Sequence, residues 1–195
     1  MRAHLLKSLA ITVLLLVASA CNRTNAVEVD PPRAAPEIEG IDWNGKPFSL
    51  GEQRGRVVLV TFGYTHCPDI CPTTLSRLRQ AVGTRDDVEV VFVTVDPERD
   101  TMERLAAYVP AFGAGFHAPT LEPAVFQRVR AGFEVVATRH YAAPGTPGQT
   151  ARYVIDHTSG IFVLDRTGRI RVRLPAEATP EDMLREVERI AGERS

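Results

Sequence analysis

The chain has 195 residues, of which 44% are hydrophobic and 24% are charged, a composition typical of a globular domain with a substantial core. The formal net charge of −1 lacks the basic excess that nucleic-acid-binding proteins usually carry. We therefore expect one folded domain and no nucleic-acid partner.

The N-terminus has the layout of a secretory signal peptide. Arg2 and Lys7 precede an apolar run over residues 9–17, and small residues follow as far as Ala20. The apolar run is shorter than the ~20 residues that a membrane-spanning helix needs, although an uncleaved N-terminal anchor is the alternative. We therefore expect residues 1–20 to be a signal peptide and the rest of the chain to be exported.

Cys21 stands directly after Ala18-Ser19-Ala20, which resembles a bacterial lipobox. The usual lipobox has leucine where this chain has Ala18, and the same residues also fit the A-x-A site of an ordinary signal peptidase. We expect Cys21 to be the lipidated first residue of the mature protein. Residues 22–36 contain three prolines and little apolar periodicity, which predicts a flexible tether before a domain over residues 37–195.

The rest of the sequence alternates between strand and helix patterns. In chain order it predicts a hairpin over 41–50, a buried strand over 56–62, a helix over 74–82, a buried strand over 88–95, helices over 102–109 and 123–133, a hairpin insertion within 133–160, a hairpin over 161–174 and a final helix over 180–192. This order predicts an α/β sandwich of the thioredoxin type, with an N-terminal β-hairpin and a β-hairpin insertion before the strand region of His157.

Cys67 and Cys71 lie between the first buried strand and the helix that follows it. Three residues separate them, whereas zinc knuckles and thioredoxin centres usually have two. A helix N-terminus carries partial positive charge, which stabilises a thiolate and lowers its pKa. Pro68 stiffens the intervening loop, and Pro72 suits an early helical position. We therefore expect both sulfurs to point the same way at the start of the helix.

Two thiolates are soft ligands, and soft ligands favour Cu(I) over harder divalent ions. A structural zinc site would need four protein ligands, more than these two cysteines and a few histidines readily supply. A structural disulfide is the plainer alternative, but it would close a very short loop and stabilise the fold little. The pattern therefore favours a copper site of two cysteines and one imidazole.

His157 is the histidine that the predicted fold brings to the cysteine pair, because in such a sandwich the segment entering the strand at Ile161 faces the cysteine turn. Asp156 is a candidate to orient its ring. His66 adjoins Cys67, so its side chain should point away, although it is an alternative ligand. The remaining histidines of the mature chain, His117 and His140, have the surroundings of solvated surface residues.

Three blocks carry a resemblance to a known family: FGYTHCPDICPTTL, VTVDPERDT and YVIDHTSGIFVLD. Together they resemble the Sco (SenC/PrrC) family of thioredoxin-fold copper-binding proteins, over residues 36–195. The resemblance implies copper, as Cu(I) or Cu(II), held by Cys67, Cys71 and His157. It also implies a role in assembling the CuA centre of cytochrome c oxidase, and the partner would be its CuA-bearing subunit or another copper acceptor. The protein would then be anchored at a bacterial membrane, by a lipid or a helix, on the periplasmic face.

The alternative function is a periplasmic thiol–disulfide oxidoreductase in which Cys67 and Cys71 cycle between dithiol and disulfide and reduce acceptor cysteines. Two features argue against it. The cysteine spacing is wider than in thioredoxins, and the segment entering the strand at Ile161 has a histidine and lacks the proline that thioredoxins place there. A thiol peroxidase is a weaker third reading. Asp69 and Asp96 could add negative charge near the site, whereas the VTVDPERDT block is otherwise explained by a strand end, a turn and a helix cap. We expect a metal-binding protein rather than an enzyme, and a monomer.

Overall fold

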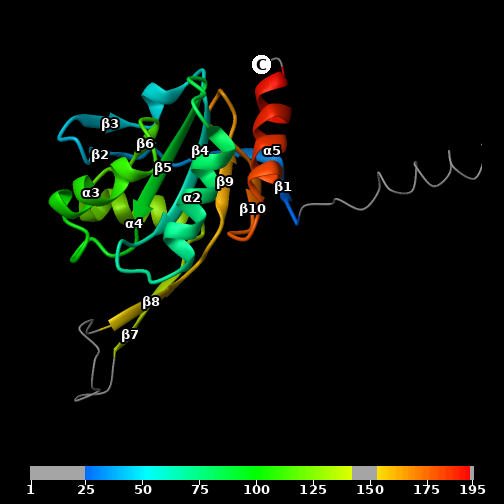
Figure 1. Ribbon diagram of the computed structural model, residues 1–195. Coiled ribbons are helices and arrows are strands. Elements are labelled where there is room, and N and C mark those ends of the chain that lie inside the picture. The colour runs from blue at the N-terminus through cyan, green and yellow to red at the C-terminus, as the bar shows by residue number, and fades with distance from the viewer. Residues whose placement is uncertain (1–24, 142–152, 194–195) are drawn as a thin grey trace, which may run out of the picture.

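The computed structural model describes residues 25–141 and 153–193 (Figure 1). The predicted signal peptide, Cys21 and the tip of the predicted insertion lie outside the described residues. Within the two described stretches, none of the helices combines the length and the apolar character that crossing a bilayer requires.

A six-stranded sheet forms the centre of the domain, in the order β1-β10-β9-β4-β5-β6. Its parallel half consists of β4 (Val57–Gly63), β5 (Val88–Thr94) and β6 (Phe116–His117), and its antiparallel half of β9 (Ile161–Leu164), β10 (Arg169–Leu174) and β1 (Val27–Ala34). The two halves meet where β4 pairs with β9. Only two residues of β6 pair with β5, which is too short a run for a sequence pattern to show.

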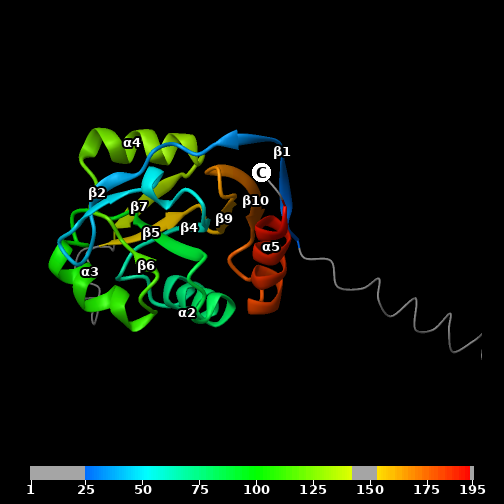
Figure 2. The ribbon, with the colours of Figure 1, turned by 90° about the horizontal axis from the view of Figure 1, so that it is seen from above.

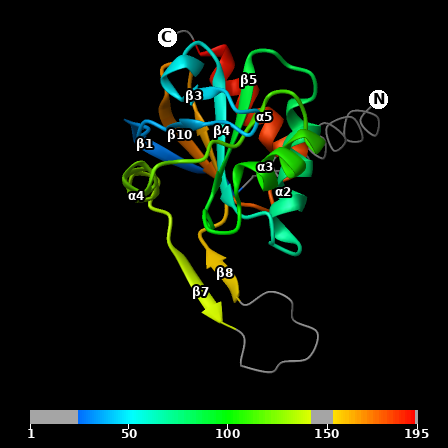
Figure 3. The same cartoon turned by 90° about the vertical axis from the view of Figure 1, so that its left-hand side faces the viewer.

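Strands β4 and β5 read as continuous apolar runs because helices cover both faces of the sheet. Alternate side chains enter two cores: Val57 and Leu59 point into one, Val58 and Val60 into the other. The first core takes side chains from α2 (Ile70–Val82), α3 (Met102–Tyr108) and α5 (Pro180–Gly192), and the second takes Val129 from α4 (Pro123–Gly132). Figures 2 and 3 show α4 on the opposite side of the sheet from α2. The short turns η1 (Gly51–Gln53) and η2 (Val109–Ala111) follow β3 and α3.

Two predicted hairpins are present beside the main sheet. The N-terminal hairpin consists of β2 (Glu39–Ile41) and β3 (Pro47–Ser49), and the insertion consists of β7 (Ala137–Tyr141) and β8 (Tyr153–His157). Figure 3 shows β7 and β8 projecting from the body of the domain. His157 is the last residue of β8, so it belongs to the insertion itself. The architecture is the predicted thioredoxin-like sandwich.

The predicted tether over residues 22–36 is wrong from Val27 onward, because Val27–Ala34 form β1 at the edge of the sheet. Val27 pairs with Arg173 and Ala34 with Arg169, both antiparallel. An edge strand bonds through one side of its main chain and leaves most side chains exposed. It therefore needs neither apolar alternation nor an absence of proline, and its sequence resembles that of a loop.

His117 was expected on the surface, and this prediction is wrong: it lies half-buried between two carboxylates. Its Nδ1 is 2.8 Å from an oxygen of Asp42, and its Nε2 is 3.3 Å from an oxygen of Glu89. Burial lowers the pKa of His117, but the hydrogen bonds to Asp42 and Glu89 outweigh it and raise the pKa to about 9. Asp42 follows β2 and Glu89 lies in β5, so the protonated imidazole ties the N-terminal hairpin to the sheet.

This cluster predicts a pH-dependent stability. Because the folded-state pKa of His117 is raised above its ordinary 6.5, the stabilisation is fully present below about pH 6.5 and is lost as pH rises through about 9. The shift corresponds to at most about 3 kcal/mol. His117→Gln should therefore lower the free energy of unfolding near pH 6 and much less near pH 10, as measured by urea denaturation under reducing conditions. His140→Gln, at an exposed histidine, is the control; equal losses for His117→Gln at both pH values would contradict the prediction.

Candidate metal centre

The cysteine turn begins where β4 ends. Gly63 is the last residue of β4, the N–H of Cys67 bonds to the carbonyl of Tyr64 at 3.2 Å, and α2 starts at Ile70. Cys67 therefore lies in the turn, and Cys71 lies in the first turn of the helix. Both are buried and both are free thiols. This is the placement that the sequence predicted.

The sulfur of Cys67 satisfies a backbone donor at the start of α2. The N–H of Cys71 lies 3.4 Å from Cys67 Sγ, whereas the side chain of the N-cap residue Asp69 makes no capping bond. The hydrogen bond from the Cys71 thiol, together with those from the N–H groups of Cys71 and Asp69, outweighs burial and lowers the pKa of Cys67 to about 4. The Cys71 thiol donates its proton in this hydrogen bond, which raises the pKa of Cys71, and the burial of Cys71 raises it further. At neutral pH the pair is thus one thiolate and one thiol.

His157 reaches the pair from the end of β8. Its Nε2 lies 3.6 Å from Cys71 Sγ, and its Nδ1 lies 3.0 Å from the carbonyl oxygen of Thr158. A carbonyl only accepts hydrogen bonds, so Nδ1 carries the proton and Nε2 presents its lone pair to the sulfur. The Tyr64 ring and the imidazole are nearly perpendicular, with 6.0 Å between ring centroids.

The three predicted ligands therefore come together as a chain of contacts, Cys67 to Cys71 to His157. They do not form a closed cage: within residues 25–141 and 153–193, no group of three or more His, Cys, Asp or Glu side chains has the geometry of a metal site. The donor set is two sulfurs and one imidazole nitrogen, which suits a soft metal ion.

Comparison with known proteins identifies the family. The model of the SCO1/SenC family matches residues 28–192. The chain belongs to the SCO1/SenC family. An SCO2-like protein of Rickettsia prowazekii is 37% identical to this Sco protein over 136 residues, which are 68% of this chain and 64% of that protein.

Two solved structures extend the likeness to three dimensions. The structure of Bradyrhizobium japonicum ScoI with copper bound shares 32% identity and a TM-score of 0.69, covering 80% of this chain and 99% of that one. The structure of Arabidopsis thaliana ScoI with copper bound shares 25% identity and a TM-score of 0.67, covering 80% of this chain and 96% of that one.

Two side chains expected near the site have other partners. Asp156 does not orient His157; its carboxylate is exposed and pairs with His140 at 3.0 Å, because alternate residues of β8 point to opposite faces of the hairpin. His66 contacts the Thr65 hydroxyl at 3.2 Å. Its Nδ1 also lies 3.7 Å from a carboxylate oxygen of Asp100.

Gly63 is a site residue that the sequence analysis missed. A Cβ at this position would lie 2.8 Å from the ring of Phe92 and 3.0 Å from Cys71 Sγ. No side chain fits there unless the sulfur or the ring moves. The glycine in FGYTHC therefore allows Cys71 to pack directly against the end of β4, and only the three-dimensional contact reveals this role.

The lowered pKa of Cys67 can be tested with Cys21 replaced by serine, so that only two thiols titrate. We expect one thiolate per chain to persist from neutral pH down to about pH 4, because the folded protein favours the charged form of Cys67. The measurement is the ultraviolet absorbance of the thiolate, together with the rate of alkylation by iodoacetamide, as a function of pH. Cys71→Ala removes the first hydrogen-bond donor and should raise the pKa of Cys67. Two thiols titrating together near pH 9 would contradict the assignment.

Proposed function

We propose that this Sco protein binds one copper ion through Cys67, Cys71 and His157 and delivers it to an acceptor protein. The observation that carries the proposal is the contact of Cys71 Sγ with His157 Nε2, beside a second sulfur at the start of the same helix. Two similar Sco structures are described with copper bound. Thiolate and imidazole ligands suit both copper oxidation states, and the two sulfurs favour Cu(I).

The protonation of the pair gives the site a ready ligand and a proton to release. Cys67 is a thiolate at neutral pH, whereas Cys71 keeps its proton because its pKa is raised. Copper binding by both sulfurs therefore releases about one proton from Cys71. His157 already has its lone pair directed at the site, since Nδ1 is held by the Thr158 carbonyl.

Delivery would proceed by ligand exchange. Three protein donors leave a soft ion open to an incoming thiolate, so the acceptor's cysteines can replace those of the donor without unfolding either protein. The acceptor we propose is the CuA-bearing subunit of cytochrome c oxidase, on the periplasmic face of a bacterial membrane. The Sco protein would act there as a monomer held by a lipid on Cys21 or by an N-terminal helix.

A second function is favoured by the same pair of free thiols. A thiolate with a pKa of about 4 next to a protonated thiol is the arrangement of a thiol–disulfide oxidoreductase, in which the thiolate attacks an acceptor disulfide and the second cysteine resolves the mixed disulfide. In that reaction the acceptor disulfide is reduced to two thiols, and Cys67 and Cys71 become a disulfide. The protein could thereby prepare the acceptor's cysteines before delivering copper.

The copper proposal is tested on the reduced protein. We expect one copper per chain, and His157→Ala should weaken binding by about ten-fold or more because it removes a ligand and keeps both thiols. His140→Ala is the matched control, since His140 lies on the same hairpin but pairs with Asp156. Competition with a Cu(I) chelator measures the affinity. Equal affinity of His157→Ala and the parent would remove His157 from the site.

Absorption spectroscopy separates the two functions. Adding Cu(II) should produce thiolate-to-copper charge-transfer bands that disappear in Cys67→Ser. The opposite result would be a parent protein that shows no such bands, binds no Cu(I) under anaerobic conditions and reduces disulfides rapidly. That result would rule out copper delivery in favour of the oxidoreductase function.

A further inference from the structure

The segment 96–100, which the sequence explained as a strand end, a turn and a helix cap, contains two fully buried carboxylates. Asp96 and Asp100 expose 0% and 1% of their surfaces. The cap of α3 is Thr101, whose hydroxyl accepts from the N–H of Arg104. Burying a carboxylate costs several kcal/mol unless it is well bonded, so the partners of these two groups need an explanation.

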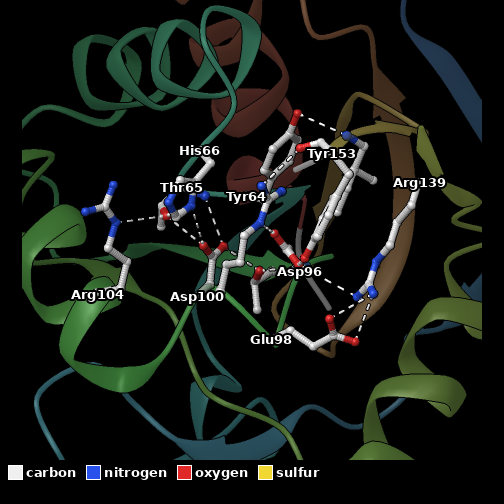
Figure 4. Close-up of polar contacts among 12 residues, drawn as sticks. Tyr64, Thr65, His66, Asp96, Glu98, Asp100, Arg104, Arg139 and Tyr153 are labelled. Atoms are coloured by element: carbon white, nitrogen blue, oxygen red, sulfur yellow. Dashed lines mark hydrogen bonds and ion pairs between the residues drawn. The ribbon is translucent and has the colours of Figure 1, made fainter. Parts of the chain in front are cut away.

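Asp100 holds the turn that leads to Cys67. It accepts hydrogen bonds from the N–H of Thr65 at 3.0 Å, from the Thr65 hydroxyl at 2.6 Å and from the Thr94 hydroxyl at 2.6 Å (Figure 4). Thr65 lies two residues before Cys67. The nearest ionisable partner of Asp100 is His66, at 3.7 Å. The buried carboxylate therefore accepts from neutral donors, two of them from Thr65 and one from Thr94 at the end of β5. The two bonds from Thr65 fix the backbone of the turn.

Asp96 holds the strand that carries His157. Its carboxylate accepts from the Tyr153 hydroxyl at 2.7 Å and pairs with the guanidinium of Arg99, and Arg139 lies 3.8 Å away. Arg99 also donates to the carbonyl of Tyr153 at 3.0 Å and stacks on its ring, 3.7 Å from the centroid. Figure 4 shows Tyr153 beside Asp96, with Arg139 and Glu98 next to them. The first residue of β8 is thus bonded through its hydroxyl, its ring and its main chain.

The two carboxylates belong to one connected network. The N–H of Asp96 bonds to the Thr94 hydroxyl at 3.0 Å, and that hydroxyl donates to Asp100. The N–H of Asp100 bonds to the carbonyl of Asp96 at 2.9 Å. A continuous set of hydrogen bonds therefore runs from Thr65, before the cysteines, to Tyr153, at the start of the histidine strand.

We propose that Asp96 and Asp100 are positioning residues that set the distance between the cysteine turn and His157, Asp100 acting through Thr65 and Asp96 through Tyr153. The inference deepens the proposed function, on which its copper readout rests. The cysteine turn and β8 come from distant parts of the chain, and segment 96–100 bonds to both. Because segment 96–100 bonds to both the cysteine turn and β8, it keeps Cys71 Sγ and His157 Nε2 within contact distance.

Hydroxyl deletions test the proposal with little change of shape. Thr65→Val and Tyr153→Phe each remove one donor to a buried carboxylate, and each should weaken Cu(I) binding about ten-fold or more, as losses of partners outside the ligand shell commonly do. Thr65→Ser keeps the hydroxyl and should restore the parent affinity. Tyr141→Phe is the control for Tyr153→Phe, because Tyr141 is an exposed neighbour whose ring centroid lies 5.6 Å from that of Tyr153. Parent-like affinity in both deletion variants would overturn the proposal.

A double-mutant cycle separates positioning from general stability. If Tyr153 acts through His157, Tyr153→Phe should cost no further affinity in a His157→Ala background. The same loss in both backgrounds would mean that Tyr153 does not act through His157 and would overturn that half of the proposal. Circular dichroism and urea denaturation should show each variant folded at the temperature of the binding assay.

A parent protein that bound no copper would refute the proposed function. The positioning role would still be testable, because it can be measured without metal. The NMR resonances of the His157 ring in the apo protein should shift in Tyr153→Phe and in Thr65→Val and stay in place in Tyr141→Phe. Unchanged His157 resonances in both deletion variants would overturn the positioning role on their own.

Discussion

The pairing of β4 with β9 is the constraint on which the site depends. Its register places Thr61 opposite Ile161, so the carboxyl end of β4 and the start of β9 lie side by side at the same end of the sheet. The buried Thr61 hydroxyl donates to the carbonyl of Gly160 at 3.0 Å, which ties β4 to the residue that precedes β9. The residues beyond each strand then have little freedom, and Cys71 meets His157 although they lie 86 positions apart in the sequence. A slip of one residue would turn the side chains of the shifted strand to the other face and displace the segment joined to it.

The local electrostatics divide the two cysteines into different roles. Cys67 lies in the turn before α2, where its sulfur accepts a backbone N–H, and its charged form is favoured. Cys71 lies deeper, between Gly63 and His157, and its neutral form is favoured. A C-x-x-x-C spacing makes this asymmetry possible, because it places one sulfur before the helix and one inside its first turn. Metal binding and thiol exchange would both begin at Cys67, the charged sulfur.

Most of the fold and the three proposed ligands could be predicted from the sequence, because long apolar runs and turn signals mark the buried strands and because the cysteine motif lies between two of them. The failures share a physical cause. An edge strand such as β1 buries few side chains, and the partners of His117, Asp96 and Asp100 come from distant segments. Periodicity reports which face of an element is buried. It carries no information about which distant donor satisfies a buried carboxylate, so these polar clusters looked like surface residues and a turn.

If the chain is anchored through Cys21 as proposed, the edge strand β1 sets how far the domain would stand from the membrane. A tether over residues 22–36 would span at most about 50 Å when fully extended, whereas β1 begins at Val27, and a five-residue link before it could reach no more than about 17 Å. With a lipid on Cys21, the domain would be held against the bilayer surface rather than suspended above it. Its acceptor would then have to present its own cysteines within a domain's width of the same membrane, and diffusion in two dimensions would bring the two proteins together.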